Sequence, residues 1–279
     1  MAQFIVDFFS RCLMRTVSIK VLLPTDKSYF PGQPVPEEKP FKTLYLLHGI
    51  YGSNGDWING TRLQSWAQAR NLAVVMPSGE NHFYLDCEDS GELYGEFIGR
   101  ELVDFTRRSF PLSRRREDTF IGGLSMGGYG ALRNGLKYHD TFGGIVALSA
   151  ALILEQAVNS TETPGRMPMD SRRYYRHVFG DLDTLLGSDK DYRALILSLK
   201  EQGADIPAIY MACGSEDFLI EQNRSYRDFL QEQGVPVTYE EAPGVHDWIF
   251  WDTFIHRALE WLPLDDAVEG ISSGNVTEK

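Results

Sequence analysis

A glycine-rich turn between residues 119 and 130 constrains the fold of this chain more than any other stretch. Residues 118–121 are mostly apolar and predict a strand, and the residues from Gly127 onwards predict the tightly packed start of a helix. Gly123 and Gly127 flank Ser125 in a Gly-x-Ser-x-Gly pattern, and their missing side chains leave room for a sharp bend between strand and helix. Such a bend exposes the serine hydroxyl. We therefore interpret Ser125 as a nucleophile rather than as part of an ordinary glycine-rich turn.

Around this turn, apolar strands alternate with segments of helical spacing. Strands that are almost uniformly apolar indicate a mostly parallel sheet that is covered by helices on both faces, so the fold class is α/β. The proline-rich segment 31–40 is expected to be a loop at the tip of a hairpin. Strands are predicted at 4–9, 16–22, 41–47, 72–76, 118–121, 144–149, 207–212 and 236–241, and helices at 57–70, 92–110, 221–233 and 247–262, besides the one that starts at Gly127.

The alternation predicts one domain over residues 1–264. It pauses between about 150 and 206, where charged residues, prolines and short helical pieces indicate an insertion or lid near the site. The polar tail 265–279 is expected to lack regular structure. A length of 279 residues is compatible with this arrangement.

Charge and composition exclude several classes of partner. The formal net charge is -12, which argues against nucleic acid and anionic membranes. The first ten residues lack a basic segment and Asp7 interrupts their apolar run, so we expect no signal peptide and a cytoplasmic protein. The three cysteines are scattered without metal-ligand spacing, so we expect reduced thiols, no metal and no cofactor. A homo-oligomer is compatible with the sequence but is not required by it.

A nucleophilic serine needs a base, and the base needs a group that orients it. Among the six histidines, His246 alone follows a predicted strand and a Pro-Gly turn and precedes a helix. The acid should lie in the loop after the strand 207–212, where both Glu216 and Asp217 occur. We prefer Asp217, because the apolar residues that follow it would bury and aim its carboxylate, and Glu216 remains the alternative.

Acyl transfer through a serine also needs fixed N–H donors for the oxyanion. One donor should be the backbone N–H of Met126, directly after the nucleophile. The other should come from the loop that follows the strand 41–47, where we select the N–H of Ile50. His48 in the same loop is expected to have a structural role.

Four segments together resemble the esterase D family of α/β-hydrolases, which includes S-formylglutathione hydrolases and tributyrin-type short-chain esterases. The resemblance runs from the first strand to about Leu262 and implies the α/β-hydrolase fold. It also implies a triad of Ser125, Asp217 and His246, with Ile50 and Met126 as the oxyanion hole. The four segments are Leu47-His48-Gly49, Gly123 to Gly130, Gly214 to Asp217 and His246-Asp247-Trp248.

The resemblance further implies an acyl pocket near Trp57 and the loop 81–86. We expect Tyr51, Trp57, Tyr84 and Trp248 to contact substrate, although from the residues alone such aromatics are as compatible with core packing. The loop after Gly49 lacks the cysteine-bearing run of the formylglutathione hydrolases, so the chain is more similar to the tributyrin-type branch.

These observations predict a serine carboxylesterase. It would hydrolyse short acyl esters, from acetyl to butyryl, through an acyl-Ser125 intermediate, and acetylated or feruloylated carbohydrate is among the candidate substrates. The alternatives are an S-formylglutathione-type thioesterase and an acyltransferase. A non-catalytic binding protein of the same fold is disfavoured, because no member of the expected triad is missing.

Overall fold

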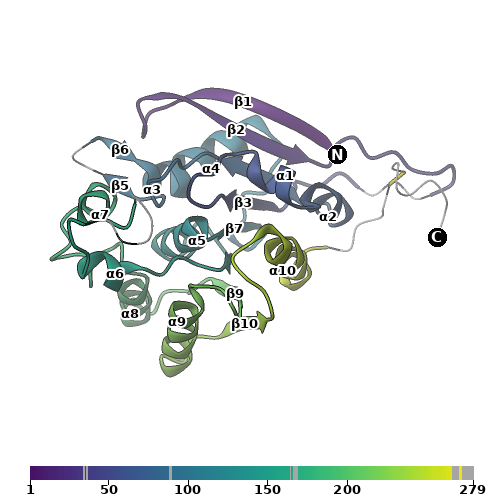
Figure 1. The fold of residues 1–279 in the computed structure, drawn as a ribbon. Helices are drawn as coiled ribbons and strands as arrows, with labels where there is room; N and C mark the ends of the chain where they lie inside the picture. The colour runs from purple at the N-terminus through teal and green to yellow at the C-terminus, as the bar shows by residue number, and fades with distance from the viewer. Residues whose placement is uncertain are drawn as a thin grey trace.

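The computed structural model describes residues 1–33, 35, 37–87, 90–163, 165, 169–265 and 270–271. Eight strands of this part form one sheet in the spatial order β1-β2-β4-β3-β7-β8-β9-β10 (Figure 1). They are β1 (Ala2–Ser10), β2 (Arg15–Leu23), β3 (Thr43–Leu47), β4 (Ala73–Pro77), β7 (Thr119–Leu124), β8 (Gly144–Leu148), β9 (Ala208–Gly214) and β10 (Val237–Ala242).

Six consecutive strands of the sheet, from β4 to β10, are parallel. The strands β3, β4, β7 and β8 are buried at every position, as expected for a parallel sheet that is covered on both faces. Within this sheet only β2 runs in the opposite direction, antiparallel to both of its neighbours, β1 and β4. The predicted α/β-hydrolase architecture is therefore confirmed. Because the central strands are parallel, the loops that follow β3, β7, β8, β9 and β10 all meet at one edge of the sheet.

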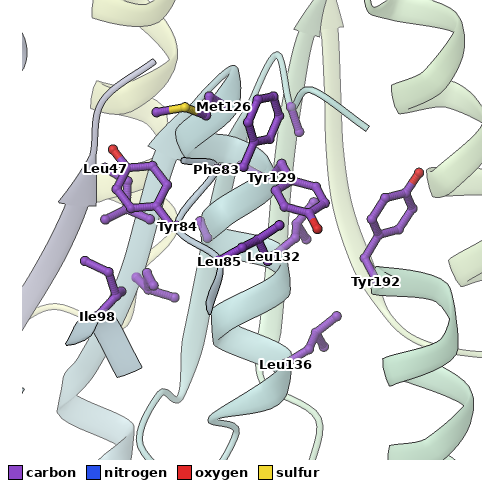
Figure 2. Close-up of a cluster of buried hydrophobic side chains, with 14 of the residues drawn as sticks. Leu47, Phe83, Tyr84, Leu85, Ile98, Met126, Tyr129, Leu132, Leu136 and Tyr192 are labelled. Atoms are coloured by element: carbon purple, nitrogen blue, oxygen red, sulfur yellow. The ribbon is translucent and has the colours of Figure 1, made fainter. Parts of the chain in front are cut away.

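Two apolar layers enclose the sheet. On one face lie α1 (Asp56–Gly60), α2 (Leu63–Ala69) and α10 (Trp248–Trp261). Figure 2 shows part of the other layer, in which Tyr129 and Leu132 pack beneath Phe83 and Met126. That layer contains α3 (Tyr94–Glu96), the π-helix η1 (Phe97–Glu101), α4 (Leu102–Ser109), α5 (Met126–Lys137), α8 (Tyr192–Gln202) and α9 (Ile220–Glu232).

Three local predictions were wrong. The chain turns at residues 11–14 between the paired strands β1 and β2. The proline-rich segment is therefore not a hairpin tip, because it connects β2 to β3, and these two strands are not neighbours in the sheet. The helix predicted at 57–70 is interrupted where Thr61 is extended. The helix predicted at 92–110 begins with the short strand β6 (Glu92–Leu93), which pairs with β5 (Asp86–Cys87), and contains the π-helical turn η1. The short 3₁₀ turn η2 (Arg116–Asp118) precedes β7.

The predicted insertion carries α6 (Leu154–Val158) and α7 (Arg172–Phe179) before α8 begins. Arg133 connects helix α5 to this predicted insertion. Its guanidinium donates to the backbone oxygen of Asp189 at 3.1 Å and to the carboxylate of Asp189 at 2.7 Å. Helix α7 lies beside β5. Most of the tail 265–279 lies outside the described residues. Among the helices of the described part, none has the length and apolar character needed to cross a bilayer.

Candidate active site

Ser125 lies at the bend between β7 and α5, with φ 53° and ψ −118°. This conformation is strained for a residue with a side chain, and such strain is common at active sites. A Cβ atom on Gly123 would lie 2.3 Å from the backbone oxygen of Gly127, and one on Gly127 would lie 2.5 Å from that of Leu47. The two glycines of the motif are therefore required by backbone packing. The sequence predicted an exposed hydroxyl, whereas Ser125 is largely buried in the structure, with 7% of the residue exposed.

The loops after β9 and β10 bring Asp217 and His246 together. The Nδ1 atom of His246 lies 2.8 Å from the Oδ2 atom of Asp217, and Asp217 is only 2% exposed. A carboxylate only accepts hydrogen bonds, so Nδ1 carries the proton and Nε2 is left as a proton acceptor. The alternative acid, Glu216, turns away and accepts from the N–H of Gly244 at 3.1 Å.

The electrostatics keep Asp217 ionised. Burial raises the pKa of this carboxyl, but hydrogen bonds to His246, to the N–H of Leu219 and to Ser149 outweigh that effect and hold the pKa below its ordinary value. The Leu219 N–H donates to Oδ1 at 2.9 Å. An ionised carboxylate at this position stabilises a protonated imidazole, as a histidine base requires.

Sequence reasoning missed Ser149, which directly follows β8. Its hydroxyl oxygen accepts a hydrogen bond from the indole Nε1 of Trp251 at 3.1 Å, and the hydroxyl also contacts Asp217. The ring of Trp251 meets the ring of His246 edge-on at 4.9 Å, and the ring of Phe218 lies 4.7 Å away from that of His246. The signal that could have found Ser149 is its position at the end of a central parallel strand.

The predicted oxyanion hole is built from two segments. Met126 is the first residue of α5, where helix N–H groups lack partners within the helix. The loop after β3 approaches the serine closely, because a Cβ on Gly49 would lie 3.5 Å from the Cβ of Ser125. Ile50 follows directly in that loop. The structure thus brings the predicted donor segments to the serine, and the roles of Ile50 and Met126 stay predictions.

His48 supports this loop from within. It is fully buried, its Nδ1 donates to the backbone oxygen of Gly49 at 2.7 Å, and its Nε2 accepts from the N–H of Gly79 at 2.9 Å. Burial lowers the pKa of His48 below its ordinary value despite the bond to Gly49. A neutral ring satisfies both bonds, because one nitrogen donates and the other accepts.

Two of the predicted substrate contacts lie beneath the same loop. Trp57 and Tyr84 are buried; the Trp57 indole donates to the backbone oxygen of Leu47 and the Tyr84 hydroxyl to that of His48, each at 2.9 Å. Trp248 packs edge-on against Trp57, with 5.5 Å between ring centroids. The hydrogen bonds of the Trp57 and Tyr84 side chains thus go to the backbone at the end of β3 and the start of its loop, and each ring also packs on a neighbouring ring, Trp57 on Trp248 and Tyr84 on His48. Their predicted role in substrate binding stays untested.

Exposed apolar side chains flank the site. Tyr51 is 63% exposed, Phe218 59% and Ile249 80%, and Val245 beside His246 is also exposed. We call these four residues the apolar rim. Each lies within three residues of Ile50, Asp217 or His246 in the sequence; Tyr51, Phe218 and Val245 lie in loops and Ile249 in the first turn of α10.

Comparisons with known proteins agree with this geometry. A family model described as putative esterase matches residues 10–262. The chain is 49% identical over 262 residues to an acetyl esterase of Caldicellulosiruptor saccharolyticus, covering 94% of this chain and 98% of that protein. It is similar to the substrate-bound structure of fluorophosphonate-binding serine hydrolase F of Staphylococcus aureus, with a TM-score of 0.81 and 30% identity. The S-formylglutathione hydrolase of the same organism gives a TM-score of 0.79 and 31% identity. Both alignments cover 94% of this chain and 98% of the other.

Proposed function

The chain belongs to the esterase family and is a carboxylic ester hydrolase, and from this we propose that Ser125 forms the acyl intermediate with His246 as base and Asp217 as its orienting acid. The single observation that carries the assignment is the 2.8 Å bond between His246 and Asp217. These residues come from separate loops at the sheet edge where the strained Ser125 also lies. A buried acid bonded to a histidine, at the sheet edge where the serine bend lies, supports a serine–histidine–aspartate assignment.

The proposed reaction has two halves. In acylation, His246 Nε2 takes the Ser125 proton, the oxygen attacks the ester carbonyl, and the oxyanion is stabilised by the N–H groups of Ile50 and Met126. The tetrahedral adduct collapses as His246 returns that proton to the leaving alcohol. In deacylation, His246 takes a proton from water, the hydroxide oxygen attacks the acyl-Ser125 carbonyl, and collapse returns the proton to the Ser125 oxygen and releases the carboxylic acid.

We propose a short acyl group, with acetyl as the preferred one. The relative that is 49% identical is an acetyl esterase. In support, the first turns of α5, which follow the serine, pack against buried side chains. Phe83 and Tyr84 belong to the buried cluster around Met126 and Tyr129, and a Cβ on Gly130 would already lie 2.5 Å from the Tyr84 ring (Figure 2). A long acyl chain would have to displace these packed rings, at considerable cost.

Hydrolysis of p-nitrophenyl acetate, butyrate and octanoate by the wild type and by Ser125→Ala tests the proposal. We expect kcat/KM to fall from acetate to octanoate, and Ser125→Ala to reduce turnover on the order of 10⁴-fold or more. A fluorophosphonate probe should label the wild type and not the variant. Ester turnover that survives in Ser125→Ala would refute the assignment of the nucleophile.

A thioesterase is the second candidate, because the formylglutathione hydrolase of Staphylococcus aureus aligns over 94% of the chain at 31% identity. The two candidates share the same acyl-enzyme chemistry and differ in the leaving group. A direct comparison of kcat/KM for S-formylglutathione and for short acetate esters distinguishes them. We expect the acetate esters to be preferred.

A further inference from the structure

We propose that Asn81 is a positioning residue that fixes the turn carrying the oxyanion donor, and that Tyr174 of the insertion anchors Asn81 in turn. This inference rests on the proposed function, because it concerns the geometry of the oxyanion hole at Ile50. Asn81 lies in the loop after β4 and Tyr174 lies in α7, so neither belongs to the loops that carry the triad.

The turn at residues 49–52 holds an unfavourable conformation. The N–H of Gly52 donates to the backbone oxygen of Gly49 at 3.2 Å, which closes a four-residue turn. Tyr51 is the third residue of this turn and has φ 65°. A positive φ at this position is typical of a type II turn, where glycine is the usual residue. A tyrosine there is strained and needs external support to remain so.

Asn81 supplies that support. Its side-chain oxygen accepts a hydrogen bond from the backbone N–H of Tyr51 at 2.8 Å. Type I and type II turns interconvert by a flip of their central peptide, which here joins Ile50 to Tyr51. The bond to Asn81 holds the N–H of that peptide in one direction. A flip would change ψ at Ile50 and φ at Tyr51 and would reverse the dipole of the peptide that directly follows the proposed donor N–H of Ile50.

Asn81 is itself anchored by the insertion. The Tyr174 hydroxyl donates to the backbone oxygen of Asn81 at 2.6 Å. Ser171 directly precedes helix α7, and its side chain accepts from the N–H of Tyr174 and so caps the helix. The Asn81 loop also closes on itself, since the N–H of His82 donates to the oxygen of Gly79 at 3.2 Å. The insertion is thereby linked to the oxyanion turn through one residue.

This link has a distinctive kinetic consequence. The oxyanion forms with every ester, whatever its alcohol, and forms only in the transition state. Loss of Asn81 should therefore lower kcat with little change in KM, by a similar factor for ethyl, butyl and p-nitrophenyl acetates when acylation limits the rate. A residue that contacts the alcohol would instead change KM and would discriminate among these substrates.

The experiment compares Asn81→Ala, Tyr51→Gly and the double variant, with Asn159→Ala as the matched control. Asn159 is an exposed asparagine whose amide donates only to the backbone of its own helix. We expect Asn81→Ala to lower kcat by about 10- to 100-fold, since removal of a whole oxyanion donor lowers it by about 10²–10³. Glycine adopts a positive φ without strain, so Tyr51→Gly in the Asn81→Ala background should recover part of kcat.

A boronic acid that forms a tetrahedral adduct provides a second readout. Its inhibition constant should rise in parallel with the loss of kcat in Asn81→Ala. Tyr174→Phe removes one hydroxyl group and keeps the ring, so it should fold and show a smaller loss of kcat than Asn81→Ala. This variant tests the inference if Asn81→Ala fails to fold. A raised KM with unchanged kcat, or a double variant no better than Asn81→Ala, would overturn the inference. Activity that persists in Ser125→Ala would instead overturn the proposed function.

Discussion

Asp217 shows what a single loop contact adds to a sequence motif. Two adjacent acids, Glu216 and Asp217, occupy the expected loop, and spacing alone does not separate them. The structure separates them, because Asp217 is buried against His246 while Glu216 faces Gly244. The sequence preference for Asp217 rested on the apolar Phe218 and Leu219 that follow it; Leu219 is buried as this reasoning requires, whereas Phe218 is exposed. Ser149 could not be found in this way, since no motif marks it.

Asp217→Asn should lower kcat/KM for p-nitrophenyl acetate by about 10³- to 10⁴-fold, because an amide can hold His246 in the wrong tautomer. Glu216→Gln is the matched control and should retain activity within about 2-fold, because Glu216 bonds only a loop backbone N–H and a neighbouring serine. Steady-state kinetics of the two variants measure the difference. Equal losses in both variants would contradict the choice of Asp217.

The lowered pKa of Asp217 also predicts how its contribution to stability depends on pH. A carboxyl group whose pKa is lower in the folded state stabilises the native state at pH values above its unfolded-state pKa, which is about 4. That contribution disappears as the pH falls through the folded-state pKa. Urea unfolding of the wild type and of Asp217→Asn should therefore show a gap in the free energy of unfolding that narrows from pH 6 to pH 3. A gap that stays constant over this range would argue against an ionised Asp217.

The elements that sequence reasoning predicted best are those whose burial is uniform. The strands β3, β4, β7 and β8 were all predicted, because their apolar runs and flanking loops are sufficient signals. The failures have physical causes. The π-helical turn η1 keeps helical apolar spacing, so it is invisible to a periodicity argument. Tertiary contacts determine which strands pair, and the local sequence does not reveal them. In the structure β2 pairs with β1 and β4, whereas the proline-rich segment connects β2 to β3.

The attachment of the insertion to α5 predicts a stability effect. Arg133 has no exposed side-chain surface, and its guanidinium donates to the half-exposed Asp189 and to the side-chain oxygen of the buried Asn134. Arg133→Met removes these charge-assisted hydrogen bonds and should lower the free energy of unfolding by about 2 kcal/mol. Arg176→Met removes an exposed pair with Glu162 and should change it by less than about 1 kcal/mol. Chemical denaturation of both variants tests the contrast, and similar values would show that the Arg133 contacts add little.

At the scale of the whole molecule, exposed large apolar side chains gather mainly in two places. Phe4, Ile5, Phe9 and Met14 lie on the β1–β2 hairpin, and the four residues of the apolar rim lie around the candidate site. Grouped apolar surface usually marks a place of contact. In the proposed mechanism the leaving alcohol receives its proton from His246, whose ring lies 4.7 Å from that of Phe218, so the alcohol would lie close to Phe218. We therefore expect the rim to favour apolar alcohols.

Phe218→Ser should reduce kcat/KM for benzyl acetate by about 10-fold while that for ethyl acetate changes by less than about 2-fold, because only the larger alcohol buries area on the ring. Leu197→Ser, which alters an exposed apolar residue of α8, is the control and should affect neither ester. Initial rates at low substrate concentration give these values directly. Equal losses for both esters in Phe218→Ser would show that the ring acts on His246 rather than on the alcohol.

The distribution of the site over separate loops has a practical consequence. The proposed triad draws on the ends of β7, β9 and β10, which share one sheet with β8 between β7 and β9, so it can assemble only when this part of the sheet has formed. An unfolded or partly assembled chain therefore cannot activate its serine. A fluorophosphonate would therefore label only native molecules. After dilution from denaturant, the labelled fraction of the protein would report how much of the sheet has refolded, without any spectroscopic signal.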